Sequence, residues 1–110
     1  MSGYFEIKPS ADSQFTFNLK AGNHEVILTS EQYSSKAAAQ GGIESVQKNA
    51  PDDARYQRKT AKDDSPYFLL VAANGETIGK SEMYKSAGAM EGGIASVKAN
   101  APGAETKPSA

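Results

Sequence analysis

Two short segments of the sequence bring together an acid, a phenol and two hydroxyls at the same spacing. Their members are Ser30, Glu31, Tyr33, Ser35 and, 51 positions later, Ser81, Glu82, Tyr84 and Ser86. Groups of these types can hydrogen-bond a polar molecule, so we hypothesise one ligand pocket per segment. Its ligand-binding side chains would be Glu31, Tyr33, Ser35 and Glu82, Tyr84, Ser86. In the structural alternative, the last serine of each segment caps a helix, the tyrosine packs over the core and the glutamate favours the positive helix end.

The other chemically capable residues do not form a recognisable catalytic or metal-binding set. His24 is the only histidine and the chain has no cysteine, so a metal site would need carboxylates alone. The doublets Asp52-Asp53 and Asp63-Asp64 lie in predicted connections, where neighbouring side chains tend to point apart. We therefore expect His24 in an exposed turn, no catalytic residues, no metal and no cofactor, and a protein that is not an enzyme.

The composition is that of an ordinary globular domain. Of 110 residues, 38% are apolar, and 12 Lys and Arg nearly balance 13 Asp and Glu. This balance gives no bulk attraction to nucleic acid or to an anionic membrane. Without cysteine, a disulfide framework is excluded. The opening MSGYFEIK has neither the basic nor the apolar region of a signal peptide, and no apolar run approaches the roughly 20 residues of a membrane span. We expect a cytoplasmic protein.

The chain contains an internal duplication with a shift of 51 positions. Residues 3–51 overlay on 54–102 without a gap, with 21 identities in 49 positions. Residues 103–110 have no apolar periodicity and are predicted to form a flexible tail. One repeat is too short to bury a sufficient core alone. We therefore expect a single domain, residues 1–102, in which both repeats share one core.

Within each repeat the apolar period changes from two to 3.6. Alternation predicts strands at about residues 4–8, 14–20 and 25–29. A helix follows, from a serine N-cap at Ser35 to a stop at Pro51, and the second repeat has the same pattern. Each unit is β-β-β-α. The predicted fold is therefore α+β, with two such units sharing one antiparallel sheet, both helices packed on one face, and pseudo-twofold symmetry.

Two rows of side chains run along each predicted helix. The apolar row, which should face the sheet, is Ala39, Ile43, Val46, Ala50 and Met90, Ile94, Val97, Ala101. Beside it runs a row of small residues, identical in both repeats: Ala38, Gly42, Ser45, Asn49 and Ala89, Gly93, Ser96, Asn100. Glycine inside a helix costs about 1 kcal/mol relative to alanine. We hypothesise that a close approach of the two helices along the small rows offsets this cost. The pattern gives no account of Gly41 and Gly92.

Three motifs occur at the same places in both repeats. They are A-x-N-x-E-x-I in a turn, S-E-x-Y-x-S before the helix and GGI-x-SV-x-x-NAP at the helix end. In these motifs the chain resembles the YegP-like family of bacterial proteins, over about residues 2–102. The resemblance implies paired β(3)-α units in one continuous antiparallel sheet, which single-repeat members would reach by dimerising. It implies no activity, because the family is one of unknown function.

The second strand of the second repeat is apolar on both faces, whereas its counterpart alternates. If the helices cover one face, Tyr67, Leu69 and Val71 point to the other, and an exposed apolar patch of this kind commonly marks a partner surface. The alternative is partial cover by long neighbouring side chains such as Arg58 and Lys59.

These observations predict a non-catalytic binding or protein-interaction module, monomeric, with an unknown protein partner. The sheet face would be its main surface and the tyrosine junctions the second. The alternative is a small-ligand receptor or enzyme that uses the polar junctions. A weak single-stranded nucleic-acid binder comes third, because aromatic sheets can stack bases and Arg55, Arg58, Lys59 and Lys62 lie near Tyr67. No membrane partner is expected.

Overall fold

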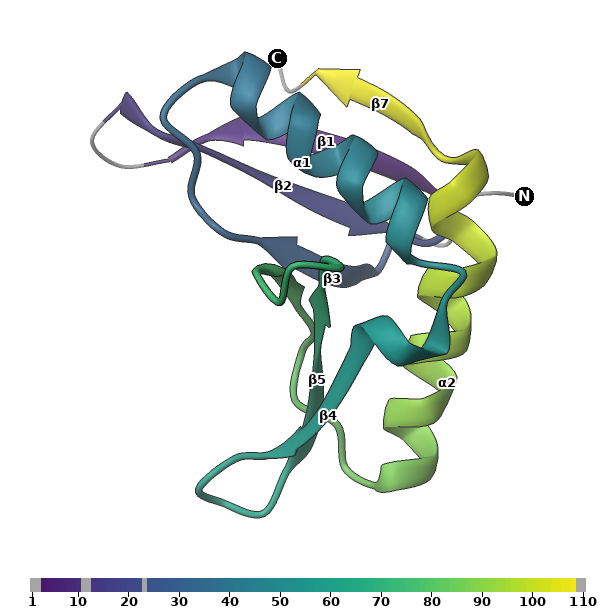
Figure 1. Cartoon of the computed structure of the whole chain (residues 1–110). Coiled ribbons are helices and arrows are strands. Elements are labelled where there is room, and N and C mark those ends of the chain that lie inside the picture. Colours follow the sequence, from purple (N-terminus) through teal and green to yellow (C-terminus); the bar gives the residue numbers. More distant parts are fainter. Residues whose placement is uncertain (1–2, 11–12, 23, 109–110) are drawn as a thin grey trace.

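A single seven-stranded sheet with two helices on one face makes up the fold of the computed structural model, which describes residues 3–10, 13–22 and 24–108 (Figure 1). The strand order is β4-β5-β6-β3-β2-β1-β7. The elements in chain order are β1 (Tyr4–Pro9), β2 (Phe15–Lys20), β3 (Val26–Ser30), α1 (Lys36–Asn49), η2 (Asp53–Arg55), β4 (Tyr56–Thr60), β5 (Pro66–Val71), β6 (Thr77–Lys80), α2 (Ala87–Asn100), η3 (Ala101–Gly103) and β7 (Glu105–Pro108).

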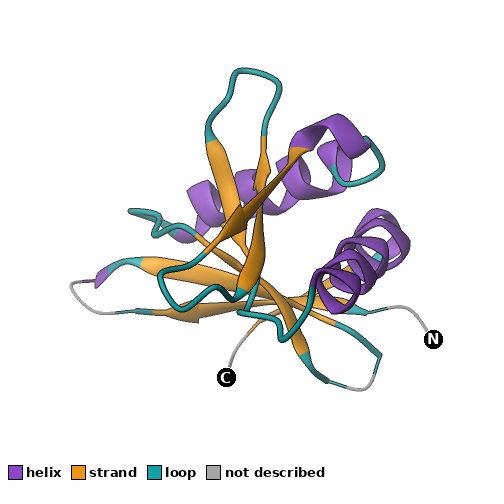
Figure 2. Ribbon diagram, turned by 90° about the horizontal axis from the view of Figure 1, so that it is seen from below, coloured by secondary structure: helices purple, strands orange, loops and turns teal. Residues whose placement is uncertain are grey.

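The two repeats join at the middle of the sheet. β3 and β6 pair antiparallel there, with Thr29 opposite Lys80 and Ser30 opposite Gly79. Thr29 and Lys80 are equivalent positions, 51 residues apart, so each repeat presents the same site to the other, as a pseudo-twofold axis requires. The predicted α+β fold of paired repeats is confirmed. Figure 2 shows how strongly the sheet twists between its two halves.

The helices form where the caps and the apolar rows predict them. The hydroxyls of Ser35 and Ser86 accept hydrogen bonds from the backbone N–H of Ala38 (3.0 Å) and Ala89 (3.1 Å). Both predicted apolar rows are buried in one core with the inward side chains of the strands: Phe5, Ile7, Phe17, Leu19, Leu28, Phe68 and Leu70. In the described part of the chain, neither helix is long and apolar enough to cross a membrane.

The end of the chain differs from the prediction. A flexible tail over residues 103–110 is wrong for Glu105–Pro108, which form β7 in parallel register with β1. The first six strands alone form the antiparallel sheet that was expected. α2 leads into β7 as α1 leads into β4, so β7 runs in the direction of a first strand. Because β1 already occupies that place, β7 lies outside it.

The small rows do not join the two helices, so that hypothesis is wrong. A Cβ on Gly42 would overlap the Tyr33 hydroxyl and lie 2.6 Å from Tyr33 Cζ and 2.9 Å from Phe17 Cε2. The tyrosine that precedes each helix folds back over it, and the glycine makes room for its ring. Gly93 relates in the same way to Tyr84 and Phe68.

The asparagines of the small rows bond within their own helices instead. Asn49 Nδ2 donates to the backbone oxygen of Ser45 at 2.8 Å, and Asn100 Nδ2 donates to that of Ser96 at 2.8 Å. Asn100 Oδ1 also accepts from the backbone N–H of Gly3 at 2.7 Å. Ala38 and Ala89, the first residues of the rows, lie beside the serine caps, where Ala38 is half-buried and Ala89 is exposed.

The expected apolar patch on the open sheet face is only partly present. Val71 is 7% exposed, so its expected outward exposure is wrong. It lies at a register shift between β5 and β6, where the alternation behind the prediction is interrupted. Tyr67 and Leu69 are half-buried, and the ammonium of Lys80 lies 5.1 Å from the centre of the Tyr67 ring. Among large hydrophobic side chains of the described residues, Met83 is the exposed one.

Candidate functional site

The two tyrosine junctions are built alike. Tyr33 stacks on Phe17 with ring centres 6.0 Å apart, and Tyr84 stacks on Phe68 with centres 6.3 Å apart. Each ring is half-buried and lies over the helical glycine of its own repeat. Of the predicted ligand-binding set, only the tyrosines point inward. The other members are exposed and do not gather round the phenols: Glu31, Ser35, Glu82 and Ser86.

The first serine of each junction fixes the chain before the tyrosine. Ser30 Oγ accepts from the backbone N–H of Phe17 at 2.8 Å and donates to the oxygen of Glu31 at 2.7 Å. Ser81 makes the equivalent bonds to Phe68 (2.9 Å) and to the oxygen of Glu82 (2.8 Å). Both serines are buried. These hydrogen bonds therefore fix the backbone just before each tyrosine.

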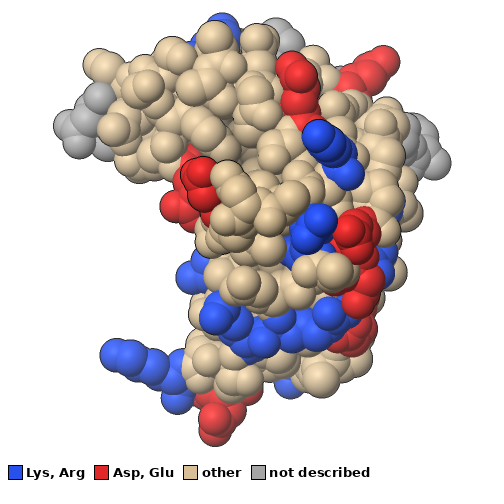
Figure 3. All heavy atoms as spheres, viewed as in Figure 1, with Lys and Arg blue, Asp and Glu red and all other residues tan. Residues whose placement is uncertain are grey.

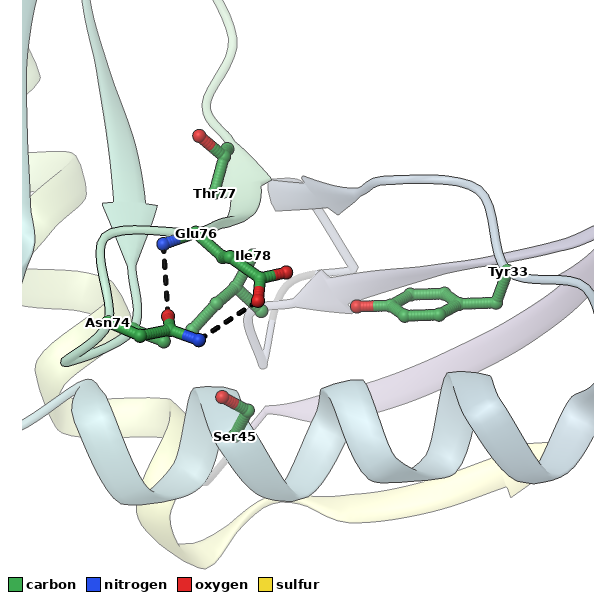
Figure 4. Close-up of a pocket in the computed structure, with 7 residues that line it drawn as sticks. Tyr33, Ser45, Asn74, Glu76, Thr77 and Ile78 are labelled. Carbon is green, nitrogen blue, oxygen red and sulfur yellow. Dashed lines mark hydrogen bonds between the residues drawn. The ribbon is translucent and has the colours of Figure 1, made fainter.

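A cavity of about 180 Å³ opens beside the Tyr33 phenol, between α1 and the β5–β6 turn. Its lining comes from both repeats: Tyr33, Ser45, Ala72, Asn74, Glu76, Thr77 and Ile78. In Figure 4 the phenol points along α1 towards the turn, and Ser45 faces the turn from the helix. This cavity is therefore formed between the two repeats and shares only Tyr33 with the pocket that the sequence predicts within the first repeat.

The β5–β6 turn holds its polar side chains in place. Gly75 has a φ of +86°, a conformation that suits glycine, and Ala72 N donates to the oxygen of Glu76 at 2.8 Å. Asn74 accepts from the backbone N–H of Glu76 at 3.0 Å and donates to its carboxylate at 2.9 Å. The carboxylate thus has one oxygen fixed by the turn and faces the cavity (Figure 4).

The Tyr33 hydroxyl, one of several polar groups that line this site, makes no hydrogen bond with any described residue. Burial of the ring, followed by the negative charges of Glu31 and Glu76, raises the pKa of the Tyr33 phenol, which therefore keeps its proton at neutral pH. A protonated phenol can both donate and accept a hydrogen bond.

A second hollow, of about 300 Å³, continues the first along α1. It is lined by Ser45, Lys48, Asn49, Ala72, Ala73 and Asn74. The two hollows share Ser45, Ala72 and Asn74. Together they form what we call the inter-repeat groove, with Tyr33 and Glu76 at one end and Lys48 at the other.

The second repeat shows the same electrostatic relation. Burial, followed by the charges of Glu82 and Glu25, raises the pKa of the Tyr84 phenol. Glu25 lies in the β2–β3 turn, which is the counterpart of the turn that carries Glu76. Asn23, the counterpart of Asn74, lies outside the described residues.

The remaining sequence candidates lie apart from the groove. His24 is exposed in a turn and pairs with the Tyr4 hydroxyl at 2.9 Å. Asp63 binds the backbone N–H of Ser65 in the β4–β5 turn, and Asp52 caps η2. Within the described ranges no group of three or more acids and histidines is placed to hold a metal ion.

Most of the groove's far wall lies outside the site that the sequence predicts. The wall residues Asn74, Glu76, Thr77 and Ile78 belong to the repeated A-x-N-x-E-x-I motif, which the sequence indicates only as a turn. For Ser45 the sequence predicts a contact between helices. A repeated turn motif that keeps a glutamate in both copies was the available signal.

The comparisons with known proteins agree with the duplication. The model of a domain of unknown function, DUF1508, matches residues 10–57 and 61–107, so its two copies start 51 positions apart. A UPF0339 protein of Bordetella pertussis is 71% identical over 107 residues, which are 97% of this chain and 96% of the relative. UPF0339 protein YegP of Escherichia coli O157:H7 is 58% identical over 100 residues, 91% of each chain.

Two solved structures have the same fold. The solution NMR structure of a UPF0339 protein from Shewanella oneidensis has a TM-score of 0.92 at 53% identity, covering 98% of this chain and 92% of that one. The solution NMR structure of the protein of unknown function yegP from E. coli also has a TM-score of 0.92 at 53% identity, covering 98% and 93%.

Proposed function

Because the chain belongs to the family of the domain of unknown function DUF1508, we propose its function from the geometry, as a non-catalytic module that binds a small polar ligand in the inter-repeat groove. The resemblance to YegP-like proteins is confirmed by the relative from E. coli. The observation that carries the proposal is the Tyr33 hydroxyl, which has no hydrogen-bond partner among the described residues and faces a cavity lined by both repeats.

The groove favours a ligand that donates hydrogen bonds at one end. Acceptors meet at the Tyr33 end: the phenol oxygen, the Ser45 hydroxyl and the Glu76 carboxylate. The cavity there, about 180 Å³, has room for a small polar group such as an amine. Lys48 lines the continuation and supplies a positive charge for an anionic group. A small zwitterion combines both features.

The open sheet face is a weaker candidate for the binding surface, although the sequence predicts a protein partner there. With Val71 covered and Lys80 over Tyr67, the apolar surface that would attract a partner is small. The monomeric state, the cytoplasmic location and the absence of membrane and nucleic-acid partners stay predictions. We also propose that the groove does no chemistry, because its acceptor end combines a protonated phenol, neutral hydroxyls and an amide with a carboxylate that is fixed by its turn.

The test is an NMR titration of the labelled protein with a library of small amines, amino acids and carboxylates. We expect at least one zwitterion to shift the signals of Tyr33 and Glu76 and to raise the melting temperature. Tyr33→Phe removes the hydroxyl but keeps the ring over Gly42, so it should weaken binding without unfolding the protein. Tyr67→Phe, on the sheet face, is the matched control. A library that leaves Tyr33 and Glu76 unshifted would overturn the proposal.

A further inference from the structure

The two outer edges of the sheet are equivalent in the repeats but differ in cover. β1 and β4 are the first strands of the two repeats, and β7 lies along the outer edge of β1. Among the described residues no strand lies along the outer edge of β4. The difference is visible in burial. In β1, Glu6 to Lys8 are partly or fully buried, whereas Gln57 to Thr60 are all exposed.

The outer edge of β4 carries free backbone groups. Ala61 N donates to the oxygen of Ser65 at 2.8 Å, and bonded and non-bonded pairs alternate along an antiparallel ladder. Arg58 and Thr60 therefore direct their N–H and C=O groups away from β5. Phe68, opposite Arg58, agrees with this, because its backbone bonds to Ser81 on the other side.

The covered edge shows how such groups are satisfied. Ser10 N donates to the oxygen of Gln14 at 2.7 Å, so by the same alternation Phe5 and Ile7 point their backbone groups outward in β1. β7 pairs with them in parallel, with Thr106 opposite Phe5 and Pro108 opposite Ile7. Arg58 is the counterpart of Ile7, 51 positions on. The chain thus contains its own example of the missing strand.

We propose that the outer edge of β4 binds an extended acidic segment of a partner protein, which pairs with it in parallel as β7 pairs with β1. Main-chain bonds to Arg58, the counterpart of Ile7, and to Thr60, which lies beyond the part of the edge that β7 covers in β1, would give affinity. Side-chain charge would give selectivity. Lys59 and Lys62 make no ion pair with any described residue, so they are free to attract carboxylates. The Arg58 guanidinium is already held by Glu91 and by Asp53, the latter at 3.1 Å.

The charges also decide between occupants. Two β4 strands pairing edge to edge would place the basic residues of Arg58-Lys59 of both copies close together, and facing like charges destabilise a strand pair. In Figure 3 the blue side chains gather over the lower half of the molecule, where Figure 1 places β4 and the β4–β5 turn, and red side chains lie beside them at the right and at the bottom. The described acids there bind Arg58 and Lys98 and not Lys59 or Lys62, so an acidic segment complements these two lysines, whereas a second copy does not.

The covered edge further indicates a small residue at the start of the segment. Ala104, just before β7, is 6% exposed, and its oxygen accepts from Gln47 Nε2 at 3.1 Å. The counterpart of Gln47 is Lys98, whose ammonium lies 2.7 Å from Asp53, the first residue of η2, just before β4. A carbonyl oxygen placed like that of Ala104 would lie near this ammonium.

The test is a titration of the labelled full chain with two blocked peptides, AETEVE and its matched control AKTKVK. We expect the acidic peptide to shift the amide signals of Arg58 and Thr60, and the lysine peptide to bind about tenfold more weakly. Lys59→Glu, an exposed change, should reverse this preference. Tyr33→Phe should leave peptide binding unchanged, because the groove is a separate site.

Four outcomes would overturn the proposal. The amides of Arg58 and Thr60 would not move with the acidic peptide, both peptides would bind alike, or Lys59→Glu would keep the original preference. The fourth outcome is self-association. If sedimentation showed a dimer and the same amides moved with protein concentration alone, the occupant of the edge would be a second copy.

Discussion

The two repeats have the same interior but differ at their rims, by which we mean the outer edge strands β1 and β4 and the side chains around them. Inside, each tyrosine lies over a helical glycine and stacks on the central phenylalanine of its repeat, and a buried serine fixes the chain before it. At the rim, β1 is covered by β7 and carries Ile7, whereas β4 is open and carries Arg58. Packing demands thus act alike on both copies in the core. At the two ends of the sheet the copies meet different neighbours.

The rim of the second repeat replaces apolar cover by charge. Arg58 bridges to Glu91 of α2 and to Asp53, which Lys98 also binds. Arg58 and Lys98 occupy the positions that are equivalent to Ile7 and Gln47 in the first repeat. An open edge must remain hydrated, and charged side chains on it also discourage pairing with another copy.

The largest expected effect tests the identity of the two interiors. Gly42→Leu and Gly93→Leu should each destabilise the protein by about 3 kcal/mol, because the added side chain must displace a stacked tyrosine and press on a buried phenylalanine. Urea unfolding at neutral pH measures both. Gly41→Leu and Gly92→Leu are matched controls, since a Cβ at either position meets nothing within 4 Å. Equal losses at Gly41 and Gly42 would show that the tyrosine packing contributes nothing.

A somewhat smaller effect is expected at the buried serines. Ser30→Ala and Ser81→Ala leave the backbone N–H of Phe17 or Phe68 without its acceptor, at a cost of about 1 to 3 kcal/mol each. The two losses should agree, since the bonds have nearly the same lengths. The exposed cap Ser35→Ala, at about 1 kcal/mol, is the reference from the same segment. If the two substitutions lowered the free energy of unfolding by clearly different amounts, the two interiors would not be equivalent.

The charged rim predicts a pH dependence that belongs to the second repeat. Hydrogen bonds from Lys98 and Arg58 lower the pKa of Asp53, and those from Arg58 lower the pKa of Glu91. Each carboxylate therefore contributes stability above its ordinary pKa near 4, which is lost as pH falls through the lowered value. Melting temperatures between about pH 6 and pH 2 should fall more steeply for the natural chain than for Arg58→Met.

Other carboxylates do not obscure this comparison. The pKa values of Glu6 and Asp63 are also lowered, by Lys20 and by Ser65, but Arg58→Met leaves these groups unchanged. The difference between the two melting profiles therefore isolates the rim. Parallel profiles would show that the bridges around Arg58 are too exposed to matter.

The sequence predicted the fold because its local signals agree. Alternating strands, the serine caps of Ser35 and Ser86 and the 51-residue shift all point to the same paired units. The sequence did not predict what packs against the row of small residues. Small side chains allow close approach of either a second helix or a tyrosine ring, and helical periodicity does not show which of the two is the neighbour. The groove was missed for a related reason. Its two walls come from different repeats, and their meeting depends on the symmetry axis.

The first glycine of each pair gives the smallest and most specific prediction. Gly41 and Gly92 are exposed on the helix face away from the core, with helical backbone and nothing within 4 Å of an added Cβ. Gly41→Ala and Gly92→Ala should therefore stabilise the protein by up to about 1 kcal/mol, since alanine restricts the unfolded chain and favours the helix. Gly42→Ala, by contrast, should destabilise it, because its methyl group meets Tyr33. If Gly41→Ala lowered the urea midpoint instead, the open space around the added methyl group would not describe the protein in solution, and the prediction would be wrong.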